Sequence, residues 1–160
     1  MLRIIDMISV YFETTIFNRY FEEGREFCAE TRLLFDKVRD EKIEAYTSVY
    51  VIDELKKAHE PKLSQMLNLI SEFGISTLEE SKEAQDLADV YIDAGIIPAK
   101  FKLDGIHIAI TAINNIDCII SLNFRHINKL KTKTATEVIH KVKGYNSPYI
   151  CTPMEVFEDE

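Results

Sequence analysis

The sequence contains no apolar run that approaches the roughly 20 residues a helix needs to cross a bilayer. Its opening stretch, MLRIIDMI, lacks the cationic region and the long apolar segment that mark a secretory signal peptide. Both absences argue against a membrane partner, and we expect a cytoplasmic protein.

Cysteine is scarce, and its placement argues against two kinds of chemistry. Cys28, Cys118 and Cys151 are widely spaced in apolar surroundings. None of them forms the C-x-x-C pair that is typical of zinc sites and thiol-redox sites. The sequence therefore predicts three buried free thiols.

Several catalytic signatures are also missing. The chain has no G-x-x-x-x-G-K-[ST], no G-x-G-x-x-G, no G-x-S-x-G and no H-E-x-x-H. A phosphatase of the haloacid dehalogenase type would need D-x-D after the first strand, where this chain has ETT. A phosphoacceptor receiver domain would need an aspartate in the third strand, where this chain has GISTL. These enzyme classes are therefore disfavoured.

Positive charge is in the minority but is concentrated in one segment. The net charge of −8 argues at first against nucleic acid, because cations are what neutralise phosphates. However, residues 1–97 carry 11 basic and 20 acidic side chains, residues 98–143 carry 8 and 3, and residues 144–160 carry 0 and 4. The basic segment indicates either a solvated helix face or a surface for an anionic partner.

The chain has the length and composition of one domain with a substantial core, since it has 160 residues of which 46% are hydrophobic. No repeat, low-complexity tract or linker divides it, and its four prolines fall at or next to the joins of predicted elements. We predict a single domain over residues 1–160, with residues 1–6 as an extension before the first strand.

Strand-like runs alternate with helical patterns along the chain. Strands are expected at SVYF (9–12), EAYTS (44–48), GISTL (74–78), DCIISL (117–122) and SPYICT (147–152). Helices are expected in segments 18–27 (NRYFEEGREF), 24–43, 47–58, 63–73, 81–95 with Gly95 as C-cap, 103–115, and 134–144 with a capping threonine and a terminal glycine. This alternation predicts an α/β fold, a three-layer α/β/α sandwich around a parallel sheet of four to five strands.

Four polar side chains fall where parallel α/β sheets bind ligands, at the carboxyl ends of strands. They are Glu13 at the end of the first strand, Glu54 in the helix after EAYTS, Asp104 at the start of LDGIHIAIT, and Asn123 in IISLNF. Clustered acids raise one another's pKa values unless a cation lies among them. Because Mg²⁺ and Mn²⁺ prefer oxygen ligands, the pattern predicts a site for one of these ions.

Each acid also has a simpler interpretation. Glu13 begins a loop, Asp104 suits a helix N-terminus, and Glu54 is close in sequence to Lys56 and Lys57. Asp53 competes with Glu54 for the second position, and the helix phase decides between them. We expect Val49, Ile52 and Leu55 to face the core, which leaves both acids at its edge.

Two hydroxyls and several titratable groups accompany the acids. Thr14 and Thr15 are expected to cap the next helix, orient the carboxylate or contact a phosphate. Asp117 is excluded, because it begins the strand that Asn123 ends, about 20 Å away at about 3.3 Å per residue.

The histidines are less informative. His107, three residues after Asp104, is either a further ligand or a packed side chain. The others have no partner at metal-ligand spacing and are expected to have no catalytic role: His59, His126 and His140. His126, beside Arg125, is placed to touch RNA.

In order and context, these segments resemble the PIN-domain family of metal-dependent ribonucleases, which includes the VapC-type toxins. The resemblance covers residues 9–157 and is carried by VYFETTIF, VIDEL, LDGIHIAIT, CIISLNFRHI and CTPMEVF. It implies metal-binding roles for Glu13, Glu54 and Asp104, the fourth, often acidic, position for Asn123, and a small hydroxyl or amide position for Thr15. The first glutamate and the uncharged Asn123 resemble an E-T-T subgroup.

This resemblance implies a Mg²⁺- or Mn²⁺-dependent endoribonuclease, the toxin of a type II toxin-antitoxin system. A metal-bound water would attack the phosphodiester and Asn123 would position that water or a second ion. The side chains expected to contact or guide the RNA are Thr15, Arg125, Lys129, Lys131 and Lys133.

The alternative hypothesis is a weak or inactive domain of the same fold that binds a protein or RNA, because the fourth acid is missing. The helix 18–27, which carries Tyr20, Phe21 and Phe27, would either form a groove for an antitoxin or a second copy of the chain, or equally be part of the core.

Overall fold

The structure is a computed structural model that describes residues 7–157. The extension expected at residues 1–6 lies outside the described residues. Within the described part, buried side chains from strands and helices form one hydrophobic cluster, which is the pattern of a domain built around a single core.

The centre of the fold is a parallel sheet. Its strands are Ile8–Phe12 (β1), Ile43–Ser48 (β2), Ser76–Leu78 (β3), Cys118–Ile120 (β4) and Tyr149–Cys151 (β5). They are arranged in the order β3-β2-β1-β4-β5, and all of the pairs are parallel. The predicted α/β fold with a parallel central sheet is confirmed, although β3, β4 and β5 are each shorter than the sequence predicts.

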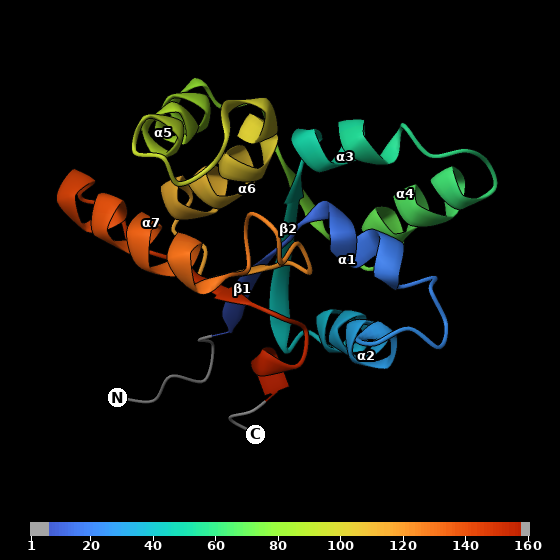
Figure 1. The fold of residues 1–160 in the computed structure, drawn as a ribbon. Helices are drawn as coiled ribbons and strands as arrows, with labels where there is room; N and C mark the ends of the chain where they lie inside the picture. The colour runs from blue at the N-terminus through green and yellow to red at the C-terminus, as the bar shows by residue number, and fades with distance from the viewer. Residues whose placement is uncertain (1–6, 158–160) are drawn as a thin grey trace, which may run out of the picture.

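Helices cover both faces of this sheet. They are Thr14–Arg19 (α1), Cys28–Arg39 (α2), Val49–Leu55 (α3), Lys62–Glu72 (α4), Lys82–Asp93 (α5), Lys102–Ile113 (α6) and Leu130–Lys143 (α7), with 3₁₀ turns at Ala99–Phe101 (η1) and Glu155–Phe157 (η2). Figure 1 shows α1, α2, α3 and α4 on one side of the sheet and α5, α6 and α7 on the other. No helix in residues 7–157 is both long enough and apolar enough to cross a membrane.

The order of the strands creates a switch point between β1 and β4. The chain moves from β1 outward through β2 to β3, then returns to the other side of β1 for β4 and β5. Tyr11 lies level with Tyr46 on one side and with Ile119 on the other. In open α/β sheets, ligands bind at the carboxyl ends of the strands beside such a switch point. Residues that follow β1 and β4 are therefore the first candidates for a site.

The predicted helix at residues 18–27 is wrong. Helix α1 ends at Arg19, and turns lead from there to α2. Gly24 (φ 84°) and Phe27 (φ 71°) have left-handed backbone conformations, which a right-handed helix cannot contain. Tyr20 and Phe21 pack against the core instead of forming a helical groove.

The start of α7 differs from the prediction, whereas the glycines expected to end two helices do so. Helix α7 begins at Leu130, four residues before the predicted start, so Thr134 lies inside the helix, where its hydroxyl donates to the Leu130 carbonyl at 3.0 Å. Gly95 (φ 73°) and Gly144 (φ 82°) have the left-handed conformation expected for glycines that end helices.

The prediction of three buried thiols holds for Cys28 and Cys118, whereas Cys151 is half-buried.

The core is rich in aromatic contacts between β1 and the helices on one face. The ring of Phe12 lies 4.9 Å from that of Phe35 and 6.2 Å from that of Phe17, and all three side chains are fully buried. Such packing fixes the end of β1 and the start of α1 firmly, and Glu13 lies between them.

Candidate metal centre

Glu13 lies where β1 ends and α1 begins. It is the N-cap residue of α1, but its side chain makes no capping bond and is only 3% exposed. Its Oε1 accepts hydrogen bonds from the hydroxyls of Thr15 and Ser121, both at 2.6 Å. Its backbone N–H donates to the carbonyl of Ile120 at 3.2 Å. The carboxylate is therefore fixed between β1 and β4, at the switch point of the sheet.

Helix phase brings Glu54, and not Asp53, to this carboxylate. Helix α3 buries Tyr50, Val51 and Leu55. Of the side chains expected to face the core, Leu55 is buried, Val49 is half-buried and packs against the core, and Ile52 is half-buried. Asp53 points to solvent, whereas the Glu54 side chain is 25% exposed. The hydroxyl of Thr14 donates to Glu54 Oε1.

His107, on α6, lies beside the two carboxylates and contacts Glu54. Its side chain is fully buried, with Nε2 2.7 Å from Glu54 Oε1 and Nδ1 2.8 Å from the Tyr11 hydroxyl. Because an ionised carboxylate only accepts hydrogen bonds, Nε2 is the donor to Glu54. The Tyr11 hydroxyl in turn lies 2.7 Å from Ser48 Oγ. A chain of buried hydrogen bonds thus orients the imidazole.

Glu13, Glu54 and His107 form a compact set of potential ligands. One ligand atom from each side chain lies within 4.8 Å of those from the other two. The two carboxylates offer oxygen ligands that suit Mg²⁺ and Mn²⁺. His107 would add a nitrogen ligand for Mn²⁺ once Nε2 gives up the proton that it donates to Glu54. The chemistry of the side chains that converge here therefore fits a divalent cation.

The pKa values reflect the crowding of charge. Burial raises the pKa of Glu13 and the charge of Glu54 raises it further, against the opposing effects of His107 and two hydroxyls. Partial burial alone would raise the pKa of Glu54, but the hydrogen bond and charge of His107 outweigh it and lower that pKa. Burial alone would lower the pKa of His107, but the carboxylates of Glu54, Glu13 and Asp104 raise it. Two carboxylates thus lie close together beside one imidazole, and each of the three groups shifts the pKa of at least one of the others.

Asp104 lies at the edge of this set. It is in the first turn of α6, one turn before His107, and its side chain is 14% exposed. Its Oδ2 is 2.9 Å from Nδ1 of His126. The structure thus groups Glu13 and Glu54 with His107, while Asp104 neighbours His107 and is held by a second histidine.

Comparisons with known proteins identify the fold that carries this site. No protein-family model matches the chain, and no curated protein matches it. Among solved structures, the chain matches one in the crystal structure of VapBC2 from Rickettsia felis bound to a DNA fragment from its promoter, with a TM-score of 0.58 and 11% identity over 91% of this chain and 98% of that one. The chain has the PIN-domain fold.

A second solved PIN-domain structure supports the same arrangement. It is VapC20 of Mycobacterium tuberculosis, a toxin that cleaves the sarcin-ricin loop. The TM-score is 0.55, with 10% identity over 76% of this chain and 97% of that one. At such low identity the likeness concerns the path of the backbone, so the roles of individual side chains depend on the geometry described above.

Asn123, at the fourth position of the PIN-domain pattern, takes part in a turn. Its Oδ1 accepts the backbone N–H of His126 at 3.0 Å, and its carbonyl accepts those of Ile127 and Asn128 at 3.1 and 2.8 Å. The side chain therefore shapes the loop between β4 and α7.

His126, which has no partner at metal-ligand spacing in the sequence, has one in the fold. Its ring is almost fully buried, packs 4.2 Å from that of Phe101, and binds Asp104. This burial leaves little of the ring for contact with RNA. No spacing rule could have found the pair, because 22 residues separate its members and tertiary packing brings them together.

Three buried side chains that sequence reasoning missed support the site: Tyr11, Ser48 and Ser121. Strand periodicity offered a signal for Tyr11, because residues two apart on a strand point to the same face, which places Tyr11 on the side of Glu13. For Ser121, the signal was its position at the end of the strand that precedes Asn123.

The side chains predicted to contact RNA have different surroundings. The Thr15 hydroxyl donates to Glu13 and accepts the N–H of Leu122 at 2.8 Å, so it orients the carboxylate and does not cap α1. Arg125 is exposed, and Lys131 donates to the carbonyl of Gly95 at 3.3 Å. The remaining two, Lys129 and Lys133, are half-buried on either side of the start of α7.

Asp117 lies at the amino end of β4, where its carboxylate accepts the N–H of Ser9 at 2.9 Å. It is thus at the opposite edge of the sheet from Glu13, as expected.

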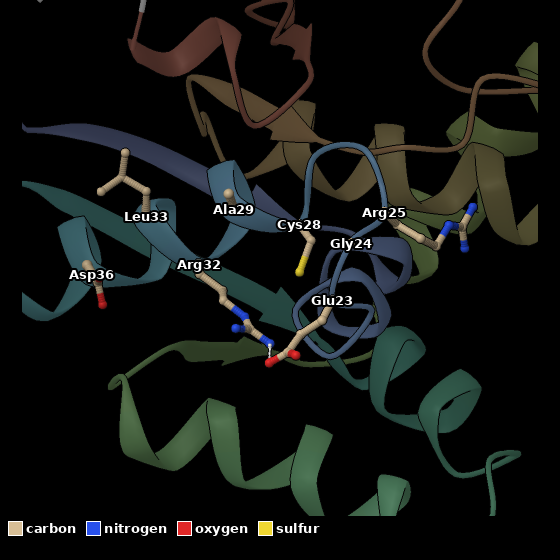
Figure 2. Close-up of a pocket in the computed structure, with 8 residues that line it drawn as sticks. All are labelled: Glu23, Gly24, Arg25, Cys28, Ala29, Arg32, Leu33 and Asp36. Atoms are coloured by element: carbon tan, nitrogen blue, oxygen red, sulfur yellow. Dashed lines mark hydrogen bonds and ion pairs between the residues drawn. The ribbon is translucent and has the colours of Figure 1, made fainter.

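A separate hollow of about 530 Å³ lies beside α2, where Arg32 and Glu23 point toward each other at 3.3 Å (Figure 2). None of the potential metal ligands lines this hollow.

Proposed function

We propose that this protein is a divalent-metal-dependent endoribonuclease that cleaves phosphodiester bonds in single-stranded RNA. The observation that carries the proposal is the convergence of Glu13, Glu54 and His107 within 4.8 Å at the carboxyl edge of a PIN-type sheet. The RNA-cleaving toxin among its structural neighbours supports the same reaction class.

The proposed ligands for Mg²⁺ or Mn²⁺ are Glu13, Glu54 and Asp104, with His107 as the nearest additional donor. When bound, a divalent ion lowers the pKa of a coordinated water and stabilises the charge that develops on the phosphate. Such an ion would also relieve the repulsion between the buried Glu13 and the half-buried Glu54.

The surrounding side chains prepare this site. Thr15 and Ser121 both donate to the same oxygen of Glu13, Oε1, so they fix the orientation of the carboxylate. Tyr11 orients the ring of His107, and His126 holds Asp104. In the proposed mechanism Asn123 positions the attacking water or a second ion, and the cations of the basic segment guide the RNA backbone: Arg125, Lys129, Lys131 and Lys133.

We further propose that the protein is the toxin of a cytoplasmic type II toxin-antitoxin pair. The likeness to a chain of the VapBC2 complex motivates this proposal. The antitoxin, or a second copy of the chain, would occupy the surface beside residues 20–27 and α2, where the hollow in Figure 2 lies.

One observation favours a second candidate, a PIN-fold binding module without catalysis. The fourth position carries no charge, and the oxygen of the Asn123 amide is already bound to the N–H of His126. A module of this kind would bind a protein or RNA without consuming it.

The decisive experiment is cleavage of a labelled mixed-sequence RNA with Mn²⁺, Mg²⁺ or EDTA. Wild-type protein should cut only with metal, and Asp104→Asn, prepared identically, should not cut, which rules out a contaminating ribonuclease. Calorimetry with Mn²⁺ separates the candidates, since the enzyme should bind the ion below millimolar concentration. Absence of both cutting and metal binding would favour the binding module.

A further inference from the structure

A second polar cavity lies next to the candidate metal centre. It has a volume of about 390 Å³ and opens between two segments that are far apart in the sequence. Residues 92–99, at the end of α5 and the approach to η1, form a mostly apolar wall, and residues 125–131, at the start of α7, form the other.

The charges of this cavity are all of one sign. Arg125, Lys129 and Lys131 line it, together with His126, and no acidic side chain among the described residues does. This is notable in a chain with a net charge of −8. Three cations around one cavity repel one another unless an anion lies between them.

Internal contacts position this basic wall. The guanidinium carbon of Arg125 lies 5.3 Å from the centre of the Phe101 ring, and the ring of His126 packs on the same phenylalanine at 4.2 Å. The ammonium of Lys131 donates to the carbonyl of Gly95, which ties the two walls together. Because Arg125 is held against an aromatic ring, less side-chain freedom is lost when it binds a ligand.

His126 connects the cavity to the candidate metal centre. Its ring lines the cavity, while its Nδ1 lies 2.9 Å from Asp104 Oδ2. A ligand in the cavity would therefore be one side chain away from a proposed metal-binding carboxylate. A polyanion with regularly spaced charges could occupy both places at once.

From these observations we propose that the cavity is a subsite for one backbone phosphate of the RNA, next to the phosphate that is cleaved. The identity of the ligand rests on the proposed function. Arg125 supplies two parallel N–H donors to the phosphate oxygens and Lys129 supplies a charged amine, while Lys131 mainly holds the wall. Lys133 does not line the cavity and is not part of the subsite.

The test is RNA binding in EDTA, where a metal-dependent enzyme does not cut. Affinity of a fluorescently labelled single-stranded RNA is measured by anisotropy for wild type and for the double variant Arg125→Gln/Lys129→Gln. We expect binding about tenfold weaker, and a slope of log K against log salt that is smaller by about 0.7, the value for one phosphate contact with a single strand.

A matched control shows whether the loss of affinity comes from the cavity or from a general loss of positive charge. Lys143→Gln and Lys141→Gln, combined in one variant, remove two exposed cations at the far end of α7, about 16 Å or more from its start at 1.5 Å per residue. This variant should bind within about twofold of wild type. If it loses as much affinity and salt slope as the double variant, the cavity is not a subsite.

A second pair of variants leaves the cations in place. Ala99→Glu puts a carboxylate on the exposed part of the cavity wall, and Ala29→Glu puts the same charge on exposed α2. Only Ala99→Glu should weaken binding severalfold, and equal effects would overturn the proposal.

Metal-dependent cutting is assayed in parallel, so that the two proposals can fail separately. If the protein binds RNA through the cavity but never cuts it, the proposed nuclease is refuted and the subsite is not. If wild type cuts RNA and the double variant binds RNA as well as wild type does, the subsite is refuted and the nuclease is not.

Discussion

Two fully buried histidines, His107 and His140, lie in different polar networks of the same domain. His107 lies beside two carboxylates, and its pKa is raised despite its burial. His140 lies between two neutral hydroxyls, those of Tyr91 and Ser147, and burial lowers its pKa to about 4. The same residue type at the same depth therefore has opposite electrostatic character.

The difference teaches where this protein places charge. The network of His140 joins α5, α7 and the loop before β5 through neutral hydrogen bonds, which satisfy buried polar atoms without net charge. The network of His107 collects acids at one edge of the sheet and leaves them only partly compensated. Burying unpaired charge is costly, so such an arrangement indicates a binding site more than a stabilising device.

The largest expected effect concerns the charged network. Glu54→Gln keeps an oxygen that can accept from His107 but removes the charge, and RNA cleavage should fall at least about 1,000-fold, because metal stabilisation of the transition state is worth several kcal/mol. Asp53→Asn, the exposed neighbour on α3, should cleave within about twofold of wild type. Equal activity of the two variants would remove Glu54 from the site.

His140 in the neutral network should make a distinct contribution to the pH dependence of stability. Because the folded pKa of His140, about 4, lies below its ordinary value of 6.5, the unfolded chain binds the proton more tightly. Stability is then highest above pH 6.5 and falls by about 3 kcal/mol as the pH drops to about 4.

Urea unfolding at several pH values between 7.5 and 4 measures this effect. His140→Gln should be less stable at pH 7.5 but should lose less stability on acidification than wild type, because the carboxylates titrate in both proteins. If the two proteins lose the same amount, His140 is not the group responsible.

A smaller effect is expected from the hydroxyls that orient Glu13. Ser121→Ala removes one of the two donors to its Oε1, and should weaken Mn²⁺ binding about 10- to 100-fold, as is usual for groups that orient a ligand. Ser147→Ala removes a comparable hydroxyl from the neutral network and should leave Mn²⁺ affinity unchanged. Calorimetric titration of both variants gives the comparison, and a matching loss in Ser147→Ala would contradict it.

The smallest expected effect is a difference between Tyr11, in the network of His107, and Tyr91, in the network of His140. Tyr11→Phe and Tyr91→Phe each remove one buried hydroxyl that binds a histidine, and each should lower the free energy of unfolding by about 1–2 kcal/mol. Only Tyr11→Phe should also slow RNA cleavage, because Tyr11 orients a ring of the metal centre. Kinetics beside urea denaturation would show whether the two networks are functionally distinct.

Much of the fold could be predicted because local patterns specify it. Runs such as SVYF and EAYTS are rich in residues that suit a pleated, buried surface, and both became strands of the parallel sheet. The helix expected at residues 18–27 failed, because Phe27 adopts a left-handed conformation that its residue type does not announce. A mixture of aromatic and charged residues was not sufficient evidence of a helix there.

The acidic part of the site was partly accessible in the same way. Glu13 stands at the end of a recognisable strand, and Asp104 at the start of a recognisable helix, so their positions followed from local order. The choice between Asp53 and Glu54 did not, because α3 also buries Tyr50 and Val51, which lie outside the core face expected from the sequence. A helix of seven residues is too short for its apolar pattern to define one face.

The sequence by itself determined the alternation of strands and helices, the acids at their ends and the basic segment near the C-terminus, because these features depend on neighbouring residues. Tertiary structure decided which side chains meet: Ser121 with Glu13 across 108 residues, His107 with Glu54 across 53, and His126 with Asp104 across 22. Such contacts depend on strand order and helix phase in a packed core, which no local spacing specifies.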